Sequence, residues 1–357
     1  RALLTQEKDH KMKLQLSAMA AAMALFTIAG CESTPPPAPP NTLVAMKVAA
    51  APNMAALAAD PAWARAQPLS VKLSDGVNFA GGKGETTATL KAVYTADMLY
   101  MLIQYQDPTN SVRRSPYQKQ ADGSWIQLKD PANKGGDDNI YYEDKWAFLW
   151  PASPVRNFDK QGCTVACHTG EGKPYGNKYT RDEGEILDMW HYKGMRTAPM
   201  GFVDDQYTDH TRYDKDKSPN AGRKGDPGGA EYNAFPLENG KPKFMDKSGR
   251  AANAGGKYWI ARDDEVPFDD SKFKAGDEVA AHISNVLQGD RADVRVASGW
   301  ANGMHTSVIS RKLVTGSKFD VQWNDLNARY AFGFAAFDNA QVRHATADEP
   351  SFLVFGK

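Results

Sequence analysis

Six consecutive residues near the middle of the chain, Cys163-Thr-Val-Ala-Cys167-His168, restrict its fold more than any other feature of the sequence. Two thiols followed directly by an imidazole form the arrangement that attaches a c-type haem, with the histidine placed as an axial ligand of the iron. Three residues separate the cysteines here, one more than in the usual spacing. The motif predicts one covalent haem c on Cys163 and Cys167, with His168 as its axial ligand.

The N-terminal part of the chain has the pattern of an export signal. An apolar run over residues 16–29 follows a short basic start at Met12 and ends in Ile-Ala-Gly before Cys31. Such a run is too short for a membrane span, and its ending resembles a bacterial lipobox. We therefore expect residues 1–30 to be leader and lipoprotein signal peptide. Lipidated Cys31 would hold the exported chain on the periplasmic side or the cell surface; the alternative is a plain signal peptide with an incidental cysteine.

Residues 31–43 are dominated by proline, which extends as polyproline II and forms neither helix nor sheet ladder. This segment is expected to be a tether between the lipid and one folded domain at 44–357. With Cys31 lipidated, Cys163 and Cys167 are the one remaining cysteine pair. A small disulfide loop and a zinc site are alternatives for this pair, although zinc requires a second Cys/His cluster that the sequence lacks.

The charge balance bears on the partners of the protein. The chain has 43 basic and 43 acidic residues, so its formal net charge is zero. A broad basic face for nucleic acid is therefore not expected. Local patches of charge could still support brief docking to redox proteins. Such partners would be other cytochromes or a membrane or periplasmic oxidoreductase.

Short apolar and aromatic runs, bounded by Asp, Gly or Pro, recur in both halves of the domain and predict strands. The predicted strands are 89–94, 98–105, 145–150, 278–283, 293–297, 306–311 and 330–337. This pattern predicts a mainly β fold, an immunoglobulin-like β-sandwich that binds haem. Residues 159–260 are rich in Gly, Pro, Asp and Lys and predict a long, mostly irregular insertion, with one short helix near Glu183–Met195. An irregular segment of this length is expected to cover the haem.

Several short motifs, in this order along the chain, resemble the haem-binding domain of ethylbenzene dehydrogenase γ subunits. That family includes the γ subunits of dimethylsulfide, selenate and chlorate enzymes of the dimethyl sulfoxide reductase type. The c-type members carry Gly-Cys-x-x-x-Cys-His and, downstream, Glu-x-x-Asp-x-Trp-His-x-Lys. The motifs are Asp60-Pro-Ala-Trp63, Leu99-Tyr100, Asp107-Pro-Thr109, Glu143–Trp150, Gly162–His168, Glu185–Lys193, Gly303, Arg311–Leu313, Phe332–Asp338 and Arg343-His344.

The resemblance also implies the ligands of the iron. Typical γ subunits hold a b haem between a Met after the central strand and a Lys near the C-terminus. His168 stands at the position of that Met, and no Lys stands near the second position, where Arg343-His344 lies. His344 is therefore the expected distal ligand. The alternative is His191, which otherwise would bond a propionate or the backbone.

Other residues are candidates for the surroundings of the haem. Propionate carboxylates could pair with the cationic side chains of Lys193, Arg196 and Arg343. The porphyrin faces could be covered by the aromatic rings of Trp190, Tyr192 and Tyr179. His282 is expected in the core of a strand, and His305 at the surface or in a cross-strand pair.

These features favour a membrane-anchored monohaem cytochrome that transfers single electrons in a respiratory chain, and not an enzyme. The sequence contains no Ser/His/Asp order, no second metal motif and no phosphate loop. Two alternatives stay open: a haem enzyme that acts on a small oxidant, and a haem-free surface lipoprotein.

Overall fold

The computed structural model describes residues 39–133, 136–166, 178–229 and 231–357. The described residues belong to one compact unit. Cys31, Cys167 and His168 lie outside the described residues, so the predictions on them stay predictions. None of the helices in the described ranges combines the length and the apolar character that a membrane span requires.

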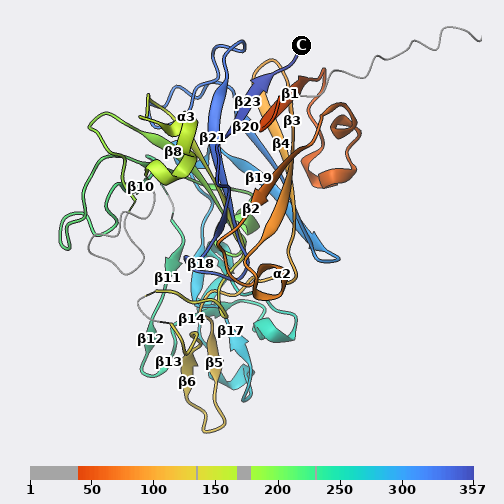
Figure 1. Ribbon diagram of the computed structural model, residues 1–357. Helices are drawn as coiled ribbons and strands as arrows, with labels where there is room; N and C mark the ends of the chain where they lie inside the picture. The colour runs from red at the N-terminus through yellow and green to blue at the C-terminus, as the bar shows by residue number, and fades with distance from the viewer. Residues whose placement is uncertain (1–38, 134–135, 167–177, 230) are drawn as a thin grey trace, which may run out of the picture. The chain divides into compact units, whose positions relative to one another are not determined.

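One large sheet dominates the fold (Figure 1). Its strands are β1 (Thr42–Lys47), β2 (Leu69–Leu73), β3 (Thr86–Tyr94), β4 (Met98–Gln106), β7 (Lys145–Pro151), β8 (Leu187–Lys193), β9 (Asp204–Thr208), β10 (Arg223–Gly225), β19 (Arg295–Ala301), β20 (Met304–Lys312), β21 (Tyr330–Phe337), β22 (Ala345–Thr346) and β23 (Ser351–Phe355). Their order is β10-β9-β8-β7-β21-β23-β1-β3-β4-β20-β19, with β2 beside β3 and β22 beside β21. The sheet is mixed, because β1 runs parallel to both β3 and β23 while the other pairs are antiparallel.

Two halves of this sheet pack against each other across an aromatic core. The indole N–H of Trp146 on β7 donates to Ser307 Oγ on β20 at 3.1 Å. The hydroxyl groups of Tyr192 on β8 and Ser298 on β19 lie 3.0 Å apart. Strands at opposite ends of the strand order therefore face each other, and their inward aromatic side chains fill the space between them. Large, flat side chains contribute most of the buried area in such a core.

A second, smaller core is built by short strands that do not belong to the large sheet. These strands are β5 (Tyr117–Lys119), β6 (Trp125–Gln127), β11 (Asn233–Ala234), β12 (Leu237–Glu238), β13 (Lys241–Pro242), β14 (Phe244–Asp246), β15 (Ile260–Ala261), β16 (Glu265–Pro267), β17 (Glu278–Val279) and β18 (His282–Ser284). Trp125 packs edge-on against Phe268 and Phe273 in this core, with ring centroids 5.2 and 5.9 Å apart. Segments that precede and follow β7 in the sequence therefore pack together in this smaller core.

The helices are all short. They are η1 (Met54–Ala59), η2 (Pro61–Arg65), α2 (Phe79–Gly82), α3 (Phe158–Gln161), η3 (Gly162–Val165), η4 (Ala198–Met200), η5 (Ala252–Ala254), η6 (Arg262–Asp264), η7 (Asp270–Lys272) and η8 (Gly289–Ala292). Gly162, with φ of 56°, separates α3 from η3 by a backbone conformation that disfavours other residues. This turn places Cys163 at the start of a new helical turn, directly after α3.

The prediction of a mainly β fold is confirmed, but three finer expectations are wrong. The helix expected near Glu183–Met195 is β8, a strand whose residues are all buried; apolar residues on both faces hid its period of two. The segment 159–260 was expected to be mostly irregular, but its first part contains β8, β9 and β10, which extend the large sheet. The mixed sheet also departs from the all-antiparallel immunoglobulin-like arrangement.

Two further sequence predictions can be compared with the strands. The single strand expected at 278–283 is divided between β17 and β18, which belong to different sheets. His282 is buried, as expected of a core residue. His305 is also buried and pairs with Tyr105 across β20 and β4, so the cross-strand expectation holds and the surface expectation is wrong.

Candidate functional site

Cys163 lies in η3, which packs on the large sheet over β21. A Cβ added to Gly333 of β21 would stand 2.5 Å from Cys163 Sγ, so the close approach of the thiol requires glycine there. The same sulfur lies 4.0 Å from Thr346 Oγ1 on β22. Cys163 is thus fixed against the strands that precede and follow the loop containing His344.

The strand register shows which residues share the sheet face under Cys163. Side chains alternate between faces along a strand, so Gly333, Ala335 and Phe337 of β21 lie on one face. Ala335 pairs with Ala147 of β7, and Ala147 pairs with His191 of β8. We call these five residues the Cys163 face. Its centre is formed by small side chains, and its far end by two rings, Phe337 and His191.

Two described stretches of the chain, one that ends at Ala166 and one that starts at Lys178, lie beside this face. The backbone N–H of Tyr179 donates to the carbonyl oxygen of Ala166 at 3.2 Å. Lys178, next to Tyr179, is close enough to His191 to lower its pKa. Ala166 and Lys178, the described residues on either side of the stretch with Cys167 and His168, therefore both lie beside the Cys163 face.

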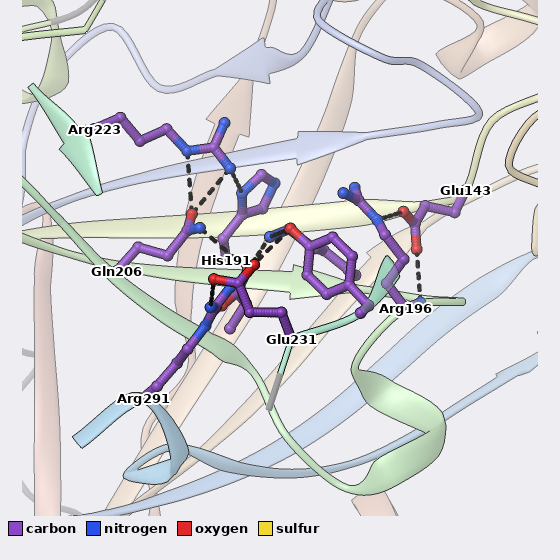
Figure 2. Close-up of polar contacts among 10 residues, drawn as sticks. Glu143, His191, Arg196, Gln206, Arg223, Glu231 and Arg291 are labelled. Carbon is purple, nitrogen blue, oxygen red and sulfur yellow. Dashed lines mark hydrogen bonds and ion pairs between the residues drawn. The ribbon is translucent and has the colours of Figure 1, made fainter. Parts of the chain in front are cut away.

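His191 is a buried member of the Cys163 face with a defined proton position. Its Nδ1 lies 3.2 Å from a guanidinium nitrogen of Arg223, which also contacts Gln206 (Figure 2). A guanidinium can only donate, so Nδ1 accepts and the proton of the neutral ring is on Nε2. Burial, followed by the nearby cations Lys193 and Arg223, holds the pKa of His191 well below its ordinary value. The ring is therefore neutral, with Nε2–H as a donor that has no acceptor among the described residues.

His344 has the opposite tautomer. Its Nδ1 lies 2.8 Å from the carbonyl oxygen of Val342, and a carbonyl can only accept. The proton is therefore on Nδ1, and in the neutral ring Nε2 carries the lone pair that a metal requires. Phe337 contacts both histidine rings, with centroids 4.8 Å from His344 and 5.9 Å from His191. The structure thus brings both candidate distal ligands to one end of the Cys163 face.

A buried ionic network surrounds Asp204 on β9, which pairs with His191 of β8. Asp204 forms ion pairs with Lys193 of β8 and with Arg291, whose Nε lies 2.7 Å from the carboxylate. Arg291 also pairs with Glu231 at 2.6 Å. Burial raises the pKa of Asp204, but Lys193 and Arg291 outweigh it and lower the pKa below its usual range. The charge of Lys193 is therefore compensated within the protein.

Arg196 and Arg343 also have carboxylate partners. Arg196 Nε pairs with Glu143, whose carboxylate accepts backbone N–H groups of Met195 and Arg196 at 2.7 and 3.1 Å. Arg343 Nε lies 2.6 Å from Asp137, and about half of its side chain is exposed. The three cations predicted for propionates thus pair with protein carboxylates. Arg223, which sequence reasoning missed, is the one whose contact with His191 is shown.

Trp190 does not lie with the other predicted site residues. It is on the face of β8 opposite His191, fully buried, with its ring centroid 5.2 Å from Trp150 and 5.7 Å from Trp323. Tyr192 shares that inner face and stacks on Trp146 at 5.1 Å. These rings form the core between the two halves of the sheet, on the face opposite the Cys163 face, and their predicted contact with a porphyrin stays a prediction.

Gly333 and Phe337 were not among the sequence candidates. The signal that could have found them is the alternation of β21, in which Gly333, Ala335 and Phe337 occupy one face and Phe332, Phe334 and Ala336 the other. A glycine between aromatic strand residues is typical of a place where another chain segment approaches closely. That segment is η3.

Three comparisons with known proteins bear on this chain. A carbohydrate-binding module of family 9 from Caldicellulosiruptor kristjanssonii, solved with cellotriose, is 10% identical over 88% of this chain and 93% of that chain, with a TM-score of 0.33. A putative carbohydrate-binding protein from Bacteroides uniformis is 10% identical over 88% and 99%, also with a TM-score of 0.33. Similarities this distant support no statement about a ligand. A search of curated proteins found no match.

A comparison of the sequence with protein-family models assigns the family of the chain. The family model described as ethylbenzene dehydrogenase matches residues 60–348, which include η3, β7, β8, β21 and the His344 loop. The match covers most of the chain and confirms the resemblance seen in the motifs. The chain therefore belongs to the ethylbenzene dehydrogenase family, whose known case is a haem-carrying subunit of an oxidoreductase.

Proposed function

We propose that this chain is a γ-subunit-like cytochrome with one covalent haem c, which passes single electrons between an oxidoreductase and other redox proteins. The observation that carries the proposal is that the Cys-x-x-x-Cys-His motif starts at Cys163, over a sheet face whose far end, at Phe337, contacts His344. Family membership supports a haem. Covalent attachment, the electron-transfer role and the site residues are our inference from the motif and this geometry.

The residues on the Cys163 face fit such a group. Small side chains at Gly333, Ala335 and Ala147 leave a flat floor, and Phe337 adds an apolar ring at its far end. The thiols of Cys163 and Cys167 would form the two thioether bonds, and His168 would be the first axial ligand. When bound, haem c supplies a single-electron redox couple.

The tautomers favour His344 over His191 as the second axial ligand. Nε2 of neutral His344 carries a lone pair because Nδ1 donates to Val342. Nε2 of His191 carries a proton because Nδ1 accepts from Arg223. That Nε2–H is suited to donate to a propionate carboxylate, and Arg223 adds a positive charge to the same region. His191 is therefore proposed as a propionate partner.

With histidines on both sides, the chain leaves no coordination position for a substrate, which favours an electron carrier over a haem enzyme. Lipidation of Cys31 would keep the carrier at a bacterial membrane, within diffusing reach of its partners. Several acyl methylenes, each worth about 0.8 kcal/mol, hold a protein to a membrane without a spanning helix.

The test is expression of the full chain in a bacterial host with cytochrome c maturation machinery. A denaturing gel should retain the haem stain, intact mass should rise by one haem, and the reduced protein should show a low-spin, six-coordinate spectrum. Variants Cys163→Ser and Cys167→Ser should each leave one thioether bond or none. Complete extraction of haem by acid acetone from the unaltered protein would contradict covalent attachment.

Electron transfer and anchoring need separate measurements. The purified protein should exchange electrons rapidly with other cytochromes and should not turn over nitrite, peroxide or sulfur oxyanions. Turnover that disappears in His168→Ala would instead establish an enzyme. Labelled fatty acid should be incorporated into the chain and lost in Cys31→Ala, with release of the protein from the membrane fraction; labelling that persists in this variant would exclude Cys31 as the lipid site.

A further inference from the structure

Three aspartates from distant parts of the sequence converge at the ends of three strands. Asp107 follows β4, Asp144 precedes β7 and Asp338 follows β21. Carboxylate oxygens of the three lie within 4.8 Å of one another, and all three side chains are buried. Like charges this close repel strongly when they are removed from water. The arrangement therefore requires protons or a cation.

The hydrogen bonds of these aspartates do not supply a positive charge. Asp144 accepts backbone N–H groups of Ser111 and Asn339 at 2.6 and 2.9 Å. Thr109 donates its N–H to Asp107 at 3.2 Å and its hydroxyl to Asp338 at 3.0 Å. One oxygen each of Asp107 and Asp338, Oδ2, has no hydrogen-bond partner among the described residues.

None of the ion pairs among the described residues includes Asp107, Asp144 or Asp338, and the groups that donate hydrogen bonds to these carboxylates are neutral. The carboxylates are thus held together without a compensating lysine or arginine, whereas other buried acids of this protein, Glu143 and Asp204, have close cationic partners.

Tyr105 provides a second, independent observation. Its ring is 1% exposed, and its hydroxyl has no hydrogen-bond partner among the described residues. Tyr105 and Asp107 are two residues apart at the end of β4, so their side chains extend from the same face of the strand. A buried hydroxyl that could donate to a carboxylate, yet bonds to none, is expected where both groups are oriented toward a third partner.

We propose that Asp107, Asp144 and Asp338, with the hydroxyl of Tyr105, bind one divalent cation of the calcium class. All donor atoms are oxygens, which hard cations prefer over the nitrogen and sulfur ligands of zinc or copper. The site is buried, so protein oxygens must replace most of the hydration shell of the ion. Calcium accepts this exchange and irregular geometry, whereas magnesium retains several waters.

The cation would join three segments of the fold. It would tie the end of β4 to the start of β7 and the end of β21, where Asp338 directly follows Phe337. Phe337 packs on both His191 and His344. The cation would therefore hold the far end of the Cys163 face in place, whether or not haem is attached there.

A second group of buried acids serves as the matched control. Asp188, Asp205 and Asp320 also lie within 4.8 Å of one another. There, however, Arg311 lies 2.9 Å from Asp320 and 3.7 Å from Asp188, so that group already contains a cation. The variant Asp205→Asn changes this group and leaves the proposed site intact.

The experiment measures Tb³⁺ luminescence and calcium-dependent thermal stability of the full chain. Trp300 donates its indole N–H to the carbonyl oxygen of Asp107 at 2.9 Å and is close enough to sensitise Tb³⁺. The unaltered protein and Asp205→Asn should show sensitised emission that calcium displaces. The double variant Asp107→Asn/Asp338→Asn should lose it, and Tyr105→Phe should weaken calcium binding several-fold.

Thermal unfolding with calcium or with EDTA tests cation binding independently of luminescence. Calcium in excess over EDTA should raise the melting temperature of the unaltered protein by several degrees, because a ligand of the folded state stabilises it. In EDTA the double variant should be the more stable of the two proteins, since it lacks the carboxylate repulsion; in calcium the order should reverse. An unaltered protein that gains no stability from calcium, or a double variant that still binds Tb³⁺, overturns the proposal. Loss of emission in Asp205→Asn alone also overturns it.

Discussion

Nδ1 of His344 donates a hydrogen bond to the carbonyl oxygen of Val342, so in the neutral ring the lone pair is on Nε2. This relationship leads to the first prediction. Replacing His344 by Ala should convert a low-spin spectrum to a high-spin one and shift the reduction potential, because axial ligands largely set both properties. Absorption spectra in both redox states, with a potentiometric titration, provide the measurement.

His191→Ala is the matched control for that prediction. It removes the other imidazole that contacts Phe337 and should leave the spectrum low-spin, with a smaller change in potential through loss of the proposed propionate contact. A high-spin spectrum in His191→Ala combined with an unchanged one in His344→Ala would transfer the ligand assignment to His191.

The close approach of Cys163 to Gly333 gives the second prediction. Gly333→Ala places a methyl group 2.5 Å from Cys163 Sγ, so η3 must move away from β21. We expect a clear reduction in covalently bound haem, measured as haem stain per unit of protein. Gly299→Ala is the control, because its Cβ meets only the flexible end of Leu57 at 3.2 Å. Equal haem content in the two variants would show that the position of Cys163 is not critical.

Much of the fold could be predicted from the sequence because most strands carry a clear local signal. The runs at 98–105, 145–150 and 330–337 match β4, β7 and β21 closely. β8 was missed because both of its faces are buried. Apolar residues therefore occur on both faces, and polar and apolar residues do not alternate along the strand. The parallel pairing of β1 depends on contacts distant in sequence, which no local pattern encodes.

The candidate site shows the same division. The proposed attachment motif is local and visible in six residues, and the order of motifs in the family pointed to His344. The tautomers of His191 and His344 depend on Arg223 and Val342, and the contact of Arg223 follows from the β9–β10 pairing. Cations such as Lys193 had a suitable charge for a propionate, but their carboxylate partners become visible only in three dimensions.

The buried ion pair of Glu143 and Arg196 gives the third prediction. Burial raises the pKa of Glu143, but Arg196 and Arg114 outweigh it and hold the pKa below its usual value, so the carboxylate is charged. Glu143→Gln would leave Arg196 without its counter-charge and should lower the free energy of unfolding by about 3 kcal/mol. Urea denaturation at neutral pH measures this loss.

The exposed pair of Arg156 and Asp182, whose charged atoms are 3.1 Å apart, is the control for this ion pair. Asp182→Asn should cost less than about 1 kcal/mol, because solvent screens the pair. A cost for Glu143→Gln no larger than that for Asp182→Asn would show that the buried pair contributes little.

His282 of β18 leads to the last prediction, which concerns acid stability. Burial, followed by the nearby Arg114 and Arg196, holds the pKa of His282 well below its ordinary value of 6.5. Below pH 6.5 the unfolded chain therefore binds a proton that the folded protein does not bind, and stability falls as the pH falls. This one group should account for a loss of about 2 kcal/mol between pH 7 and pH 5. His282→Gln should reduce the pH dependence of the free energy of unfolding by that amount, whatever its effect at pH 7. Equal losses on acidification in the unaltered protein and in His282→Gln would show that His282 is protonated without unfolding.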